Sequence, residues 1–208
     1  MKSHAIKLDN ASLMQKVALR RRLIDEMNER GIDPVVMETH GGEGVLYRYL
    51  YSNLPAGIVM EKDPDKVATL SRDRSEWGVY RCHCDVGLRV GIGKGWGVNL
   101  VDIDSYGHPW GHLEALLEGD RDWPDTLGIA FTDGIKHMLI LQRAWKIKQL
   151  QDKVDKYGND YIYKNYLSIT REHVEEKIAE RGYTLDDWSG FYTGREKMLT
   201  FYSAICVR

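Results

Sequence analysis

Acidic residues flank a glycine-rich segment near position 40 of this 208-residue sequence. Within residues 38–44, Gly42 and Gly44 allow a tight turn and let the backbone approach a ligand closely. A helix that begins directly after such a turn presents free N–H groups to the same ligand. The segment by itself also fits an ordinary turn, so its meaning depends on the residues that follow it.

Two further acids, Glu61 and Asp85, each follow a segment with the pattern of a β-strand. An acid at the carboxyl end of the strand after a glycine-rich turn is placed to accept hydrogen bonds from ribose hydroxyls. We expect this role for Glu61, and we expect Asp85 to reach an adenine amine. Either acid alone fits a solvated strand end, but the ordered set with Glu38 favours a nucleoside-binding site at one edge of a parallel sheet.

The nucleoside could belong to a dinucleotide or to S-adenosylmethionine. The dinucleotide fingerprint G-x-G-x-x-G places glycine or alanine at position 47, where this sequence has Tyr47. With its acid, glycine-rich loop and second acid, the chain resembles class I S-adenosylmethionine-dependent methyltransferases over residues 33–208. The resemblance implies that S-adenosylmethionine is bound by Glu38, His40, Gly42, Gly44, Glu61, Asp85 and Asp102.

A second segment with chemical potential follows the apolar residues 98–103. Asp102 and Asp104 alternate with Ile103, so both acids point to the same side of a strand. Residues 104–109 resemble the D-P-F-G-x-P motif of tRNA guanine-N2 methyltransferases, with Ser105 in place of the usual proline. The resemblance implies that Asp104 accepts the hydrogens of a substrate amine and that Tyr106 stacks on a planar base. An ordinary polar loop is the alternative.

Cysteine and histidine residues give no local pattern of a metal site. Strand alternation would put Cys82 and Cys84 on one face and His83 on the other, so these three side chains could not converge on one ion. His108 and His112 have helical spacing but no evident partner ligands. We therefore predict no metal. We also expect the glycine-rich residues 91–97 to lie near the site, with Trp96 at its entrance.

Residues 136–171 are locally basic and rich in tyrosine. Eight Lys and Arg residues stand against three Asp residues, and four tyrosines lie among them. Such a mixture suits phosphate contact and base stacking by a nucleic acid, RNA above all. It is equally typical of a solvated helix face followed by a tyrosine-rich connection.

The elements that must position these residues alternate between strand and helix. We expect strands at 35–38, 57–61, 79–84, 98–103 and 127–131, with helices at 11–30, 45–51 and 135–156. Strand-like residues 189–193 and 199–207 are separated by too few residues for a crossover helix, so this pair must be antiparallel. The sequence therefore predicts an α/β fold with a doubly wound, seven-stranded, mostly parallel sheet and a C-terminal antiparallel hairpin. We assign residues 1–31 to an N-terminal helical extension and residues 32–208 to the methyltransferase domain.

Composition limits the classes of partner and the cellular compartment that we expect for the protein. The formal net charge of −2 gives no overall attraction to nucleic acid, so such a partner needs a local basic patch. No apolar run is long enough to cross a membrane, and three cysteines with no disulfide spacing favour a reducing cytoplasm. The leading hypothesis is a methyltransferase for an amine of an RNA base. A small-molecule or protein methyltransferase and a non-catalytic cofactor-binding subunit are the alternatives.

Overall fold

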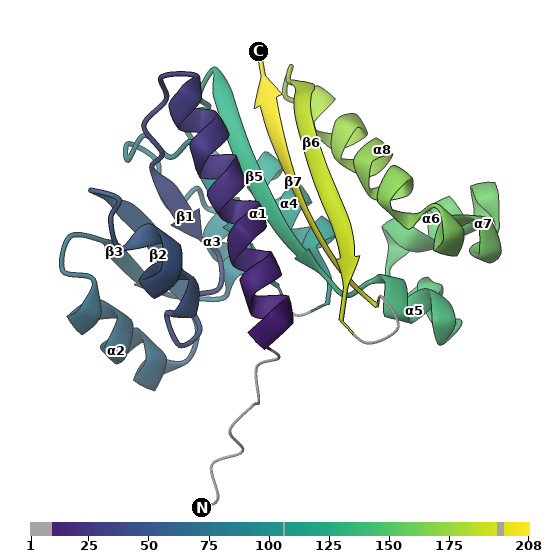
Figure 1. Cartoon of the computed structure of the whole chain (residues 1–208), viewed down its shortest axis with the longest axis horizontal. Coiled ribbons are helices and arrows are strands. Elements are labelled where there is room, and N and C mark those ends of the chain that lie inside the picture. Colours follow the sequence, from purple (N-terminus) through teal and green to yellow (C-terminus); the bar gives the residue numbers. More distant parts are fainter. Residues whose placement is uncertain (1–9, 106, 195–197) are drawn as a thin grey trace, which may run out of the picture.

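The computed structural model describes residues 10–105, 107–194 and 198–208 as one α/β unit (Figure 1). The strands are β1 Val36–Glu38, β2 Gly57–Glu61, β3 Gly78–Arg81, β4 Leu100–Ile103, β5 Thr126–Asp133, β6 Thr184–Thr193 and β7 Leu199–Val207. The α-helices are α1 Asn10–Glu29, α2 Pro64–Asp73, α3 Cys84–Arg89, α4 Pro109–Glu118, α5 Lys136–Ile140, α6 Lys148–Tyr157, α7 Asn159–Lys164 and α8 Tyr166–Ala179. A π-helical turn covers Tyr47–Tyr51 and a 3₁₀ turn covers Ala144–Lys146.

The strands form one seven-stranded sheet in the order β3-β2-β1-β4-β5-β7-β6. The pairs among β1 to β5 are all parallel, whereas β7 runs antiparallel to both β5 and β6. The chain reverses direction between Thr193 and Leu199, which are partners at the closed end of the β6–β7 hairpin. The predicted sheet and its C-terminal hairpin are therefore confirmed.

Strand alternation divides the core between the two faces of the sheet. Met37 and Ile58 point to the face covered by α3, α4 and α8. Val36 and Val59 point to the opposite face, which α1 crosses (Figure 1). Helix α1 places Met27, which is fully buried, in this second core. Because parallel strands need cover on both faces, α1 contributes buried residues to the core on this face of the sheet.

Several element boundaries differ from the sequence predictions, and β6 begins at Thr184 and not at residue 189 as expected. Strand β3 ends at Arg81, opposite Glu61 at the end of β2, and α3 begins at Cys84, so the expected strand 79–84 was too long. The expected helix 135–156 is broken into three pieces. Gln142 has a φ of 49°, in the left-handed region where an α-helix cannot continue, so the chain turns there before α6 begins.

The glycine-rich residues 91–97 connect α3 to the beginning of β4. They lie at the amino ends of the parallel strands, where the Trp96 ring approaches Gly78 at the start of β3. The expectation that Trp96 lines the site entrance was wrong. In the described parts of the chain, no helix is both long and apolar enough to cross a membrane.

Candidate functional site

A cleft with a volume of about 440 Å³ opens at the carboxyl ends of the parallel strands. It lies beside the point where β1 has β2 on one side and β4 on the other, which is where open α/β sheets bind their ligands. The cleft is lined by Thr39, His40, Gly42, Met60, Glu61, Lys62, Lys66, Cys82, His83, Cys84, Asp85, Asp104, Ser105 and His112. Five of the predicted site residues are in this lining: His40, Gly42, Glu61, Asp85 and Asp104.

Glu61, at the end of β2, is hydrogen-bonded to the glycine-rich loop. Its Oε2 accepts a hydrogen bond of 2.8 Å from the Gly42 N–H, and its Oε1 accepts bonds from the N–H groups of Lys62 and Asp63. Gly41, which the sequence reasoning did not single out, has no room for a side chain because a Cβ there would lie 2.5 Å from Val59 Cγ2. The loop thus keeps its backbone against the sheet and leaves the cleft open above it.

Two predicted cofactor residues are buried in ion pairs and do not line the cleft. Glu38 contacts the Arg74 guanidinium, and Arg74 itself lies over the Tyr47 ring. Burial raises the pKa of the Glu38 carboxyl above its usual range, although the Arg74 charge opposes this shift. Gly44 is also absent from the lining; its φ of 69° explains why a glycine stands there.

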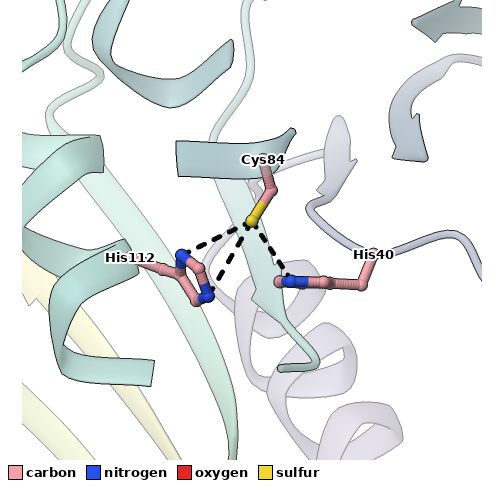
Figure 2. A group of neighbouring side chains, drawn as sticks. All are labelled: His40, Cys84 and His112. Carbon is pink, nitrogen blue, oxygen red and sulfur yellow. Dashed lines mark hydrogen bonds between the residues drawn. The ribbon is translucent and has the colours of Figure 1, made fainter. Parts of the chain in front are cut away.

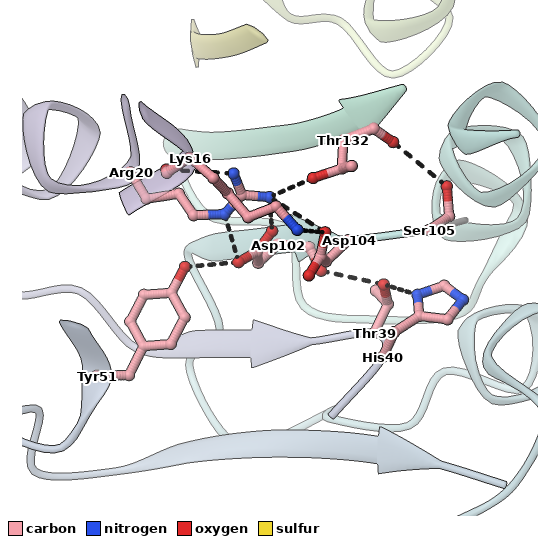
Figure 3. Close-up of polar contacts among 9 residues, drawn as sticks. All are labelled: Lys16, Arg20, Thr39, His40, Tyr51, Asp102, Asp104, Ser105 and Thr132. Carbon is pink, nitrogen blue, oxygen red and sulfur yellow. Dashed lines mark hydrogen bonds and ion pairs between the residues drawn. The ribbon is translucent and has the colours of Figure 1, made fainter. Parts of the chain in front are cut away.

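Asp102 is the second of these buried acids (Figure 3). Arg20 on α1 donates two hydrogen bonds to it, of 2.8 Å from Nε and 2.6 Å from Nη2. The Tyr51 hydroxyl donates a third, at 2.7 Å. Both Arg20 and Asp102 are only 1% exposed, so this carboxylate connects α1 to the sheet and has no free path to a ligand.

Asp104, by contrast, reaches the cleft at the end of β4. It pairs with Lys16 at 2.7 Å, lies 3.9 Å from Arg20 and is 21% exposed (Figure 3). Burial alone would raise the pKa of Asp104, but Lys16 and Arg20 lower it below its usual value. Asp104 is therefore ionised at neutral pH and offers carboxylate oxygens to a donor in the cleft. Tyr106, the predicted stacking residue, lies outside the described residues.

The structure also brings together His40, Cys84 and His112 at one side of the cleft (Figure 2). Their possible ligand atoms all lie within 4.8 Å of one another. Sequence reasoning missed this group because its members come from the loop after β1, the first turn of α3 and the middle of α4. The expected position of Cys84 on a strand also concealed it, since the residue begins a helix instead.

The basic segment at residues 136–171 is only partly available to a partner. Lys136 is buried over the Tyr192 ring, and Lys153 is buried against the carboxylates of Glu172 and Glu176. Lys156 and Arg171 also pair with glutamates just beyond the segment, at Glu172 and Glu175. The eight Lys and Arg residues against three Asp residues therefore overstate the positive charge that the folded segment exposes.

A smaller surface in this region stays exposed and basic. Arg143, Lys146 and Lys148 are exposed and form no ion pair with any described residue, and Trp145 between them is 66% exposed. We call these four residues the basic turn. It follows α5, which begins directly after the carboxyl end of β5, so the basic turn belongs to the same edge of the sheet as the cleft.

Solved structures with the same architecture are S-adenosylmethionine-dependent methyltransferases, and the chain has the class I methyltransferase fold. It is similar to TYW2 from M. jannaschii, solved in complex with AdoMet, with a TM-score of 0.60 and 13% identity over 98% of this chain and 79% of that one. Trm1 from Pyrococcus horikoshii, solved with S-adenosyl-L-methionine, gives a TM-score of 0.62 and 11% identity over 95% of this chain and 54% of that one.

A third similar structure is a putative RNA methyltransferase from Pyrococcus horikoshii, PH1948. It gives a TM-score of 0.51 and 14% identity over 90% of this chain and 81% of that one. No family model matches the sequence, and no curated protein sequence does. At these identities the likeness concerns the fold, and the function must be argued from the site itself.

Proposed function

We propose that this chain is an S-adenosylmethionine-dependent methyltransferase that binds its cofactor in the cleft at the ends of β1, β2 and β4. The observation that carries the proposal is the position of Glu61, whose carboxylate lines the cleft beside the Gly42 backbone. In this fold, an acid there accepts hydrogen bonds from ribose hydroxyls. Asp85, at the start of α3, lines the same cleft where the adenine would lie.

We propose an amine of a nucleic-acid base as the methyl acceptor, with RNA favoured over DNA. Methyl transfer to an amine depends on positioning, and a carboxylate that accepts the amine hydrogens holds the nitrogen lone pair toward the methyl group. Asp104 is ionised, lines the cleft and stands at the end of β4. The substrate proposal also draws on the resemblance of residues 104–109 to the motif of tRNA guanine-N2 methyltransferases.

The basic turn supports a nucleic-acid substrate. Arg143, Lys146 and Lys148 offer charges for phosphates, and the exposed Trp145 ring offers a stacking surface for an unpaired base. The Lys146 ammonium already lies 5.5 Å from the centre of that ring. The three unpaired cysteines Cys82, Cys84 and Cys206 favour a reducing compartment such as the cytoplasm.

Calorimetric titration with S-adenosylmethionine tests the cofactor proposal. A charge-assisted hydrogen bond contributes about 1.5–3 kcal/mol, so Glu61→Gln should weaken binding about 10- to 150-fold. The matched control is Glu43→Gln, because Glu43 belongs to the same loop but is 71% exposed and does not line the cleft. NAD should not bind. Failure of the wild-type chain to bind S-adenosylmethionine would overturn the proposal.

The substrate proposal needs a methyl-transfer assay on RNA, followed by nucleoside analysis. Asp104→Asn should lower the rate about 10²- to 10³-fold, the usual effect of removing one positioned polar group. Asp120→Asn, at an acid that is 84% exposed, should leave the rate unchanged. Cofactor binding without any transfer to RNA would favour a small-molecule or protein substrate, and full activity of Asp104→Asn would refute the role of Asp104.

A further inference from the structure

Three side chains with metal-binding atoms meet at one side of the cleft, although they are far apart in the sequence (Figure 2). Cys84 Sγ lies 3.1 Å from His40 Nε2, and it lies 3.4 Å from His112 Nδ1 and 3.8 Å from His112 Nε2. Cys84 is buried, while both histidines are half-buried and line the cleft. Neither Cys84 nor His112 has a role in the proposed methyl transfer.

The spacing fits a single tetrahedral ion. With Zn–S of about 2.3 Å and Zn–N of about 2.05 Å, tetrahedral angles place sulfur and nitrogen ligands about 3.6 Å apart. The observed sulfur–nitrogen distances of 3.1, 3.4 and 3.8 Å bracket that value. Two nitrogen ligands of a tetrahedral Zn²⁺ would lie about 3.3 Å apart, so the imidazoles, whose ligand atoms lie within 4.8 Å, would have to approach each other.

Thr39 orients the His40 ring for this purpose. The Thr39 hydroxyl donates its one proton to the Asp102 carbonyl oxygen at 3.0 Å, so it accepts from His40 Nδ1 at 2.8 Å. The proton of the neutral His40 ring is therefore on Nδ1, and the Nε2 lone pair points toward Cys84. Metal-binding histidines commonly have such a second hydrogen bond, which fixes the tautomer and the direction of the ring.

The protonation states of the two histidines agree with this geometry. Burial lowers the pKa of His40, and burial lowers the pKa of His112 to about 4. Both imidazoles are consequently neutral at pH 7, as metal ligands must be. A metal would take the place of the Cys84 thiol proton, which would leave to solvent.

We infer that His40, Cys84 and His112 bind one divalent transition-metal ion, and the two imidazoles with one thiolate suit Zn²⁺ best. Three protein ligands leave a fourth position open toward the cleft, as in zinc sites that carry water or substrate. Mg²⁺ and Ca²⁺ prefer oxygen ligands and should not compete. The inference is independent of the proposed cofactor, since it rests only on these side chains.

Cobalt substitution tests the inference directly. Reduced, chelator-treated full-length protein is titrated with Co²⁺ alone, whose four-coordinate thiolate complexes give a charge-transfer band and strong visible absorption. We expect one Co²⁺ per chain, displaced by one equivalent of Zn²⁺. Cys84→Ser should abolish the charge-transfer band. Cys82→Ser is the matched control, because Cys82 lines the same cleft outside the group, and it should keep the band.

Two further variants keep the test decisive even where Cys84→Ser disturbs the fold. His112→Asn should retain a thiolate but bind Co²⁺ more weakly, and Thr39→Val should lower Zn²⁺ affinity about 10- to 100-fold, the usual effect of removing a supporting hydrogen bond. Far-UV circular dichroism checks that each variant is folded. The inference is wrong if wild-type protein gives no thiolate-to-cobalt band, if Cys84→Ser keeps it, or if His112→Asn binds Co²⁺ as tightly as wild type. None of these results depends on S-adenosylmethionine, so they leave the proposed methyl transfer to its own test.

Discussion

Replacing Arg20 by methionine is the most informative single test of how the chain supports its cleft. Arg20 donates to both oxygens of Asp102 and also to the Thr132 hydroxyl at 3.1 Å. Methionine keeps much of the length of the side chain but removes every one of these donors. The Asp102 carboxylate would then be buried with the Tyr51 hydroxyl as its remaining partner among those described.

The size of the effect follows from the burial of the pair. Because both side chains are 1% exposed, water cannot replace the lost guanidinium. Leaving one member of such a pair unpartnered costs about 3–5 kcal/mol. For a domain of this size each kcal/mol lowers the melting temperature by about 2–4 °C, so Arg20→Met should melt about 6–20 °C below wild type.

Urea denaturation followed by circular dichroism measures the loss. Arg22→Met on the same helix is the control, because Arg22 is 46% exposed in its ion pairs and should cost at most about 1 kcal/mol. Adding Asp102→Asn to Arg20→Met removes the stranded charge and should recover part of the stability. A loss below about 1 kcal/mol for Arg20→Met, or no recovery in the double variant, would refute the reasoning.

Three further predictions concern stability and RNA contact. Burial and nearby charges lower the pKa of His173 to about 3 in the folded protein, so below about pH 6.5 the unfolded chain binds a proton that the folded protein does not. Relative to His173→Phe, the free energy of unfolding of the wild type should therefore fall by about 2 kcal/mol between pH 7 and pH 5 in urea titrations. Deleting residues 1–31 uncovers buried Val36, Ala130 and Ile205 and should abolish a cooperative urea transition, whereas a cooperative transition would support a dispensable extension. Trp145→Ala should change the free energy of unfolding by less than about 0.5 kcal/mol yet weaken single-stranded RNA binding by about 1–3 kcal/mol in a fluorescence titration.

A separate prediction concerns salt. Replacing Arg143, Lys146 and Lys148 by glutamine should lower the slope of log affinity against log salt by about 2, since each phosphate contact with a single strand contributes about 0.7. Lys156→Gln with Arg171→Gln is the matched control, because these residues pair with Glu172 and Glu175. An equal change of slope in both sets would show that the basic turn has no special role.

Local patterns predicted most of the fold. The apolar strands and the glycine-rich turn are local signals, and so is Asp63 before Pro64, which caps α2 by accepting from the N–H groups of Asp65 and Lys66. The break at Gln142 was not predictable in this way. There the helical periodicity of residues 135–156 continues, but Ile135 and Leu150 pack into a small separate core with Trp110, which requires the chain to turn.

Sequence reasoning placed residues in the cleft where their position depends on strand order, and it failed where their position depends on side chains far apart in the sequence. His40, Gly42 and Glu61 line the cleft because the carboxyl ends of parallel strands share an edge. The partners of Glu38 and Asp102 are 36 and 82 residues away. No local pattern indicates such pairs, so the sequence could not distinguish buried acids from acids that face a ligand.

Asp102 and Asp104 show how one strand end produces two different carboxylates. Alternation points both toward α1, where Arg20 and Lys16 lie one helical turn apart. Arg20 is buried and donates two hydrogen bonds to Asp102, so both oxygens of that carboxylate already have a donor. Lys16 is 19% exposed and holds Asp104 through a single bond to Oδ1, which leaves acceptor capacity on the side of the cleft. The different partners on α1 therefore make Asp102 a residue that stabilises the fold and leave Asp104 able to accept a hydrogen bond in the cleft.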